Sequence, residues 1–100
     1  MNRAAARAAA LAYDASDRRA GAAPRVVAKG AGAVADTIIR RAREAGVPIY
    51  ESRELVGLLM QVDLDTHIPP ALYLAVAEVL AWVHRLELQA GAANAAQKAR

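Results

Sequence analysis

The chain is 100 residues long, which allows one domain with a modest core and is too short for two. It is 56% hydrophobic, although alanine supplies much of that fraction, and the absence of cysteine excludes disulfides and thiolate chemistry. The net charge of +3 resides in the terminal segments, because residues 26–88 carry six basic side chains against eight acidic ones. A nucleic-acid-binding domain usually gathers positive charge on its folded surface, so this distribution disfavours that function.

The first segment is rich in alanine and arginine. Residues 4–12 have helical propensity, although Ala9, Leu11 and Tyr13 alternate with smaller residues as in a weak strand, and the sequence alone slightly favours the helix. No apolar run approaches the roughly 20 residues of a membrane span, and no apolar signal core is present at the start. We therefore expect a cytoplasmic protein without direct membrane insertion. Residues 14–24 are expected to form a loop.

The next segment predicts a strand, a helix and a second strand. Residues 25–30 form a short β-branched run closed by glycine, and residues 47–50 form another run around Pro48. Between them apolar residues recur with helical spacing, and Gly46 is well placed to end that helix. Two strands joined by a helix over so few residues predict a parallel, right-handed βαβ unit.

The last part of the chain predicts two more helices around one more strand. Ser52 is a natural N-cap for a short apolar helix, and residues 62–65 alternate apolar and acidic side chains as a half-exposed strand does. Pro69 and Pro70 open the final helix, which carries the longest apolar stripe of the chain. A polar, alanine-rich tail is expected from residue 89 onward.

Groups that could support chemistry are few. Asp63 and Asp65 share a solvated strand face, which lacks the unlike environments that an acid–base pair needs. His67 and His84 are the only histidines and lack the spacing of metal ligands. The Lys-Gly-Ala-Gly run at residues 29–32 precedes a helix as phosphate loops do, but a tight turn is the favoured interpretation. We predict no catalytic residue, no cofactor and no metal site.

Two surface features allow a second interpretation. The arginines at positions 40, 41 and 43 are best explained as a solvated helix face, with binding of an acidic partner as the alternative. Trp82 lies off the main apolar stripe of the final helix. It therefore either seals a second edge of the core or anchors a partner.

Three sequence blocks occur in a fixed order and with characteristic spacing. They are APRVVAKG at residues 23–30, REAGVPI at residues 43–49 and LYLAVAEVLAWV at residues 72–83. Together with the Ile68-Pro69 lead-in, they resemble the cytosolic domain of the FlhB/YscU family of type III export proteins, over roughly residues 8–86.

The resemblance implies an α/β fold with a small four-stranded mixed sheet flanked by helices, including the βαβ unit. It also makes residues 8–13 a strand, against their helical propensity. The chain then divides into a disordered N-terminal segment (1–7), an FlhB-like cytosolic domain (8–88) and a disordered C-terminal tail (89–100).

Full-length members of this family carry a membrane domain and cut themselves at an Asn-Pro-Thr-His motif just before the first strand. Alignment of that strand puts the motif at Arg3-Ala4-Ala5-Ala6, where no asparagine is available to cyclise. The resemblance therefore implies a non-enzymatic homologue that does not cleave itself. We expect it to lack the membrane domain and to act in trans.

The resemblance further implies a protein-interaction module of flagellar type III export, located at the cytoplasmic face of the export apparatus. In the family this domain engages export substrates and takes part in substrate-specificity switching. The expected partners are export apparatus components, export substrates, the ruler protein and a membrane-bound FlhB.

The positions that match the family's apolar dock are Ala23, Pro24, Ala77 and Leu80, and Trp82 is a further candidate. Leu80 also belongs to the core stripe, so a purely structural role is an equal alternative for it. The alternative function is a small module that binds RNA or other polyanions through its basic tails. Such binding would weaken steeply with salt.

Overall fold

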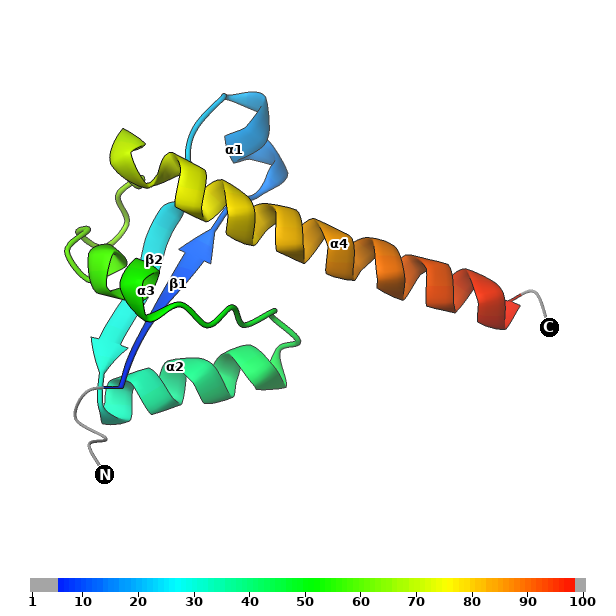
Figure 1. The fold of residues 1–100 in the computed structure, drawn as a ribbon, viewed down its shortest axis with the longest axis horizontal. Helices are drawn as coiled ribbons and strands as arrows, with labels where there is room; N and C mark the ends of the chain where they lie inside the picture. Colours follow the sequence, from blue (N-terminus) through cyan, green and yellow to red (C-terminus); the bar gives the residue numbers. More distant parts are fainter. Residues whose placement is uncertain (1–5, 99–100) are drawn as a thin grey trace.

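The structure, a computed structural model, describes the backbone of residues 6–98 and the side chains of residues 6–90. This part of the chain forms two strands, four α-helices and a 3-10 turn (Figure 1). In chain order they are β1 (Arg7–Ala12), α1 (Ala15–Arg19), β2 (Arg25–Ala31), α2 (Ala33–Glu44), α3 (Arg53–Leu59), η2 (Pro70–Leu72) and α4 (Tyr73–Lys98).

The centre of the fold is an antiparallel pair formed by β1 and β2. The register shifts between Ala10 and Leu11, so that Val27 is an extra residue with no partner opposite it, a β-bulge. The strand that the family resemblance implied at the N-terminus is thus confirmed. Pairing with β2 satisfies the backbone of this alanine-rich segment and overrides its helical propensity.

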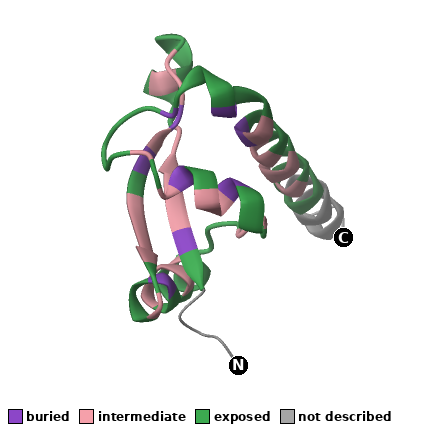
Figure 2. Cartoon of the chain, turned by 60° about the vertical axis from the view of Figure 1, so that its left-hand side comes forward, coloured by how far each residue is buried: buried purple, intermediate pink, exposed green. Residues whose placement is uncertain are grey.

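The two faces of the sheet differ in composition. Alternation on either side of the bulge places the larger side chains Leu11 and Val26 on one face. The paired positions of the other face carry only alanine and glycine, except for Arg25 at the end of the sheet. The first face supports the core, which is drawn in purple in Figure 2 together with the other buried residues. The buried members of this cluster are Val26, Leu55, Leu59, Ile68, Leu72 and Val76.

The other face is covered by α2, which crosses one end of the sheet in Figure 1. Ala35 of α2 is fully buried, and Gly30 of β2 lies so close to the helix that a Cβ there would come within 2.1 Å of Val34 Cγ1. The helix ends as its sequence predicts, with Gly46 in the left-handed region at φ 74°. This helix and its terminator are confirmed.

The expected four-stranded sheet with a parallel βαβ unit is not found in the described residues, which pair only β1 with β2. Residues 47–50 have no regular secondary structure and join no ladder. The N–H of Val47 donates to Ala42 O at 2.8 Å, and Pro48 has no N–H to give. Val47 and Tyr50 are also 53% and 40% exposed, so little apolar burial would reward pairing.

The strand expected at residues 62–65 is replaced by a turn within the segment that joins α3 to η2, residues 60–69, here called the connector. The N–H of Val62 donates to Leu59 O at 3.0 Å, and Asp65 has a positive φ of 63°. Both features belong to a turn and break the extended geometry that the alternating pattern predicted. The connector instead meets β2 a few residues later, where Arg25 and His67 form an isolated antiparallel bridge.

The two C-terminal helices follow their sequence signals. The Ser52 hydroxyl accepts the N–H of Leu55 at 3.2 Å and caps α3, and Pro70 opens η2, from which α4 continues. α4 extends to Lys98 and projects beyond the rest of the molecule in Figure 1. Its backbone is therefore helical for most of the segment expected to be a tail. The division of the chain at residues 7 and 88 stays a prediction, and residues 1–5, 99 and 100 lie outside the described residues.

Between residues 6 and 98, no helix combines the length and the apolar character needed to cross a membrane.

Candidate interaction site

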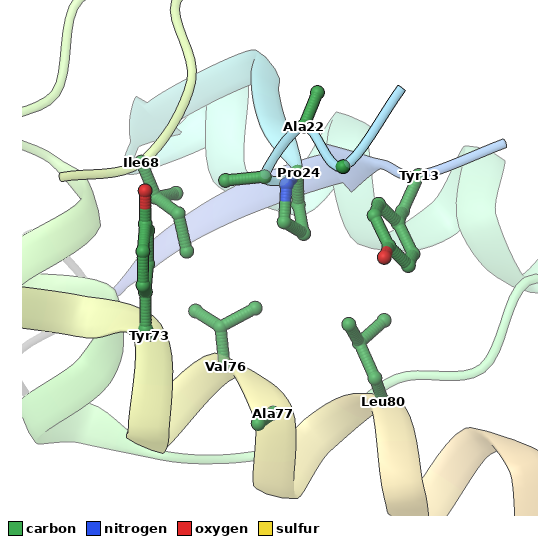
Figure 3. Close-up of a pocket in the computed structure, with 10 residues that line it drawn as sticks. Tyr13, Ala22, Pro24, Ile68, Tyr73, Val76, Ala77 and Leu80 are labelled. Carbon is green, nitrogen blue, oxygen red and sulfur yellow. The ribbon is translucent and has the colours of Figure 1, made fainter. Parts of the chain in front are cut away.

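An open hollow of about 250 Å³ lies between the residues that precede β2 and the first turns of α4 (Figure 3). We call it the α4 hollow. Most of its lining is apolar, and two tyrosines flank it. The lining residues are Tyr13, Gly21, Ala22, Ala23, Pro24, Ile68, Tyr73, Val76, Ala77 and Leu80.

One wall of the α4 hollow is the Ala23–Pro24 segment, which leads into β2. Pro24 is buried and Ala23 is half-buried. The connector holds both residues by their carbonyls. Pro24 O accepts the N–H of Ile68 at 2.9 Å, and Ala23 O accepts the Nδ1–H of His67 at 2.5 Å.

The opposite wall is formed by α4. Tyr73, Ala77 and Leu80 recur at the spacing of one helical face, and Val76 lies beside them (Figure 3). Val76 is 1% exposed and belongs to the core, Leu80 is half-buried, and Ala77 is exposed. Within about one turn of α4, the wall therefore passes from a buried core residue to an exposed one.

Four of the five residues selected from the sequence, Ala23, Pro24, Ala77 and Leu80, line this one hollow although more than 50 positions separate the two pairs. Trp82 lies elsewhere. Its half-buried ring packs edge-to-face against Tyr50, with ring centroids 5.4 Å apart and planes at 66°. Whether any of the five binds a partner stays a prediction.

Sequence reasoning missed the two tyrosines of the α4 hollow. Tyr73 lies on the same helical face as Ala77, which is a signal that spacing alone could have given. Tyr13 directly follows β1 and is half-buried, with the Arg18 guanidinium carbon 6.0 Å from its ring centroid. Its position depends on α1, which the sequence interpretation treated as loop.

α1 is held at its start by a reciprocal capping box. The Asp14 carboxylate accepts the N–H of Asp17 at 2.8 Å, and the Asp17 carboxylate accepts the N–H of Asp14 at 3.1 Å. The hydrogen bond from the Asp17 N–H lowers the pKa of the Asp14 carboxyl below its ordinary value. The Asp-x-x-Asp spacing is the sequence signal that could have predicted this short helix.

Lys29, at the start of the Lys-Gly-Ala-Gly run, is directed towards the interior. Its ammonium donates to Met60 O at 2.9 Å and to Val62 O at 2.7 Å, which satisfies two carbonyls of the connector just beyond the end of α3. The ammonium is thus engaged in the fold. The expected tight turn is reduced to Gly32, which has a positive φ of 58° and precedes α2, because Lys29, Gly30 and Ala31 are paired within β2. Within the described part of the chain, no group of three or more His, Cys, Asp or Glu side chains could hold a metal ion.

Another hollow, of about 620 Å³, opens between α2 and the alanine face of the sheet. Val27, Val34 and Val47 line it while 40%, 55% and 53% exposed, and Arg41 also contributes to its lining. We call it the α2 groove. Sequence reasoning gave no sign of this groove, because its lining comes from β1, β2, α2 and Val47, which only the fold brings together.

The fold and the α4 hollow together define a small α/β domain with an open, largely apolar surface site. Such a site suits apolar side chains presented by another molecule. The sequence profile of the FlhB HrpN YscU SpaS Family matches residues 5–83. The chain therefore belongs to this family.

Individual relatives agree with that assignment. The chain is 47% identical to the uncharacterized protein YlqH of Bacillus subtilis (strain 168) over 81 residues, 81% of this chain and 84% of that protein. It is 46% identical to the flagellar biosynthetic protein FlhB of Escherichia coli (strain K12) over 79 residues, 78% of this chain but 20% of that protein. The chain thus spans about a fifth of FlhB.

A solved structure shares the fold. The crystal structure of the cytoplasmic domain of FlhB from Shewanella putrefaciens matches with a TM-score of 0.69 and 39% sequence identity, over 78% of this chain and 61% of that one. The α/β architecture is thereby confirmed. None of these matches supports the alternative of polyanion binding.

Proposed function

We propose that the chain is a protein-interaction module of type III protein export, in which the α4 hollow receives apolar segments of export substrates. Family membership and the likeness to an FlhB cytoplasmic domain support a role in export. The substrate-binding step goes beyond that likeness. One observation carries it: Ala23, Pro24, Ala77 and Leu80 converge on one open apolar hollow.

The size of the hollow fits a weak and reversible contact. About 250 Å³ accommodates one or two large apolar side chains, each contributing roughly 1.5–3 kcal/mol on full burial. Part of that gain is spent on ordering the bound segment. Transient binding of this kind suits a module that must release each cargo before it takes the next.

The proposal extends to place and partners. We infer that the domain works at the cytoplasmic face of the flagellar export apparatus, in contact with apparatus components and with export substrates. The ruler protein and a membrane-bound FlhB are further candidate partners, through which the domain would take part in substrate-specificity switching.

The module is also proposed to be non-enzymatic and to remain uncut. Arg3-Ala4-Ala5-Ala6, aligned with the family's cleavage motif, offers no asparagine side chain to attack its own carbonyl carbon. Purified protein incubated at neutral pH should keep its full mass in mass spectrometry. Accumulation of two stable fragments split between residues 3 and 7 in protease-free samples would contradict this part of the proposal.

The substrate-binding step is tested with two charged variants of the α4 hollow. Ala23→Glu and Ala77→Glu each add bulk and charge without opening a cavity, and glutamate is a good helix former at position 77. A fluorescent synthetic peptide with the N-terminal sequence of a flagellar hook protein serves as the probe. We expect both variants to keep the wild-type thermal melt and to lose most of the peptide affinity, because binding would desolvate the new carboxylate.

The matched control is Arg41→Glu, an exposed substitution on α2, which should bind the peptide as wild type does. If both hollow variants fold and bind normally, substrates do not dock in the α4 hollow. The exposed side of Trp82 would then be the next position to test.

A further inference from the structure

The connector is attached to the start of β2 by backbone hydrogen bonds. Asp65 N–H donates to Val26 O at 2.7 Å, Val26 N–H donates to Thr66 O at 3.1 Å, and Ile68 N–H donates to Pro24 O at 2.9 Å. These bonds place the connector directly beside the wall of the α4 hollow. His67 lies between Thr66 and Ile68, the connector residues that form the last two of these bonds.

The His67 side chain reaches across to this wall. Its Nδ1 lies 2.5 Å from Ala23 O, and because a carbonyl oxygen only accepts, the proton of this bond must be on Nδ1. The bond therefore selects the Nδ1–H tautomer of the neutral ring. The His67 residue is exposed and is not among the residues that line the α4 hollow.

Proline gives this contact its importance. Pro24 has no N–H, so its carbonyl oxygen is the only backbone hydrogen-bonding group that it offers. The bond to Pro24 O comes from the backbone of Ile68, which any residue other than proline at position 68 would supply. The bond to Ala23 O comes from a side chain, so it depends on the identity of residue 67.

We propose that His67 is a positioning residue of the α4 hollow, which fixes the Ala23 wall at the distance from α4 that a bound apolar segment requires. This inference rests on the proposed function. Without the side-chain bond, the wall would keep the backbone bonds of its neighbours, Ala22 N–H to Asp17 O and Ile68 N–H to Pro24 O, and the packing of Ala23 on the core, but Ala23 would lose its own hydrogen bond. Binding would then have to order the wall as well as the ligand.

The test compares three histidine variants with the hook-protein peptide as the probe. His67→Ala should bind about three- to tenfold more weakly than wild type, the range expected for one lost hydrogen bond. His67→Asn should restore binding, because the asparagine amide nitrogen takes nearly the place of Nδ1 and donates in the same direction. His84→Ala, at the exposed histidine of α4, should bind as wild type does.

Rescue by asparagine separates positioning from general structural damage, since both variants remove the imidazole ring. Equal affinities for His67→Ala and wild type, in a preparation where Ala77→Glu abolishes binding, would overturn the inference and leave the proposed function standing. Equal weakening by the alanine and asparagine variants would also overturn it.

A second readout does not depend on peptide binding or on the folding of a variant. Nitrogen NMR shifts of the wild-type protein, recorded in alkaline buffer, should show the Nδ1–H tautomer for His67 and predominantly the Nε2–H tautomer for His84. An Nε2–H tautomer at His67 would exclude the bond to Ala23 O and overturn the inference. If the wild type fails to bind the peptide while His67 has the Nδ1–H tautomer, the proposed function fails and the bond itself stands.

Discussion

The two faces of the sheet are covered in different ways. On one face, Val26 packs under the large aliphatic side chains of α3, η2 and α4. On the other, β1 and β2 present mainly alanine and glycine, and α2 lies against them at short range. The first face is filled by side-chain volume and the second by close approach of the backbone.

The difference shows how an alanine-rich chain builds two layers on one small sheet. Volume filling gives a closed core, in which Val26 and Val76 are 0% and 1% exposed. Close approach buries Ala8 and Ala35, and the α2 groove lies open beside this contact.

The largest effect should come from a charge on the volume-filled face. Val76→Asp would bury a carboxylate in the core cluster and should lower the free energy of unfolding by about 4 kcal/mol or more, measured by urea denaturation. Val83→Asp, about two turns further along the same face of α4, should cost less because Val83 is only half-buried and its replacement can reach water. A larger loss in the free energy of unfolding for Val83→Asp than for Val76→Asp would show that the closed core extends along α4 beyond Val76.

A smaller effect is expected where α2 approaches β2. Gly30→Ala should cost about 1–3 kcal/mol, because its Cβ would meet the Val34 side chain and α2 would have to move. The cost should fall sharply in a Val34→Ala background, as a double-mutant cycle would measure.

The control for this substitution is a glycine on the other face. Gly57→Ala, within α3, would place its Cβ 3.4 Å from the flexible end of Arg7 and should stabilise the protein by about 0.5–1 kcal/mol. A cost at Gly57 as large as that at Gly30 would mean that both helices rely on close approach, and the contrast between the faces would be lost.

The smallest effect is expected at the rim of the α2 groove. Arg41→Ala replaces an exposed side chain and should change the free energy of unfolding by less than about 0.5 kcal/mol in the same urea titrations. A loss well above that value would indicate that Arg41 packs against the apolar lining of the groove and helps to close it.

The sequence predicted best those elements whose signals are local. α2, α3 and the start of α4 follow from apolar spacing, Ser52, Gly46 and Pro70, and all are confirmed. β1 could not be assigned from its residues, since alanine favours a helix and only pairing with β2 makes it a strand. The resemblance to a family supplied what the local pattern lacked.

The expected strands at residues 47–50 and 62–65 failed for a related reason. Alternation describes which side chains would share a face, but it does not say whether backbone groups are available to pair. The donor of Val47 is used to end α2, and the positive φ of Asp65 turns the chain. The four hollow residues were selected through the resemblance, whereas Tyr13 and His67 depend on α1 and the connector, which only the structure shows.

The bulge at Val27 has a consequence for the direction of the side chains that follow it in β2. Val26 and Lys29 are three positions apart, so strict alternation would direct their side chains to opposite faces. The extra residue changes the phase of the strand, so that the Lys29 ammonium reaches the carbonyls of Met60 and Val62 on the side where Val26 fills the core. Removing Val27 alone would therefore abolish the bulge and leave Lys29 and Gly30 on their present faces, whereas pairing Val27 within the ladder would turn the rest of β2 over. Whether Val27 is paired thus decides which side chains of β2 face the core.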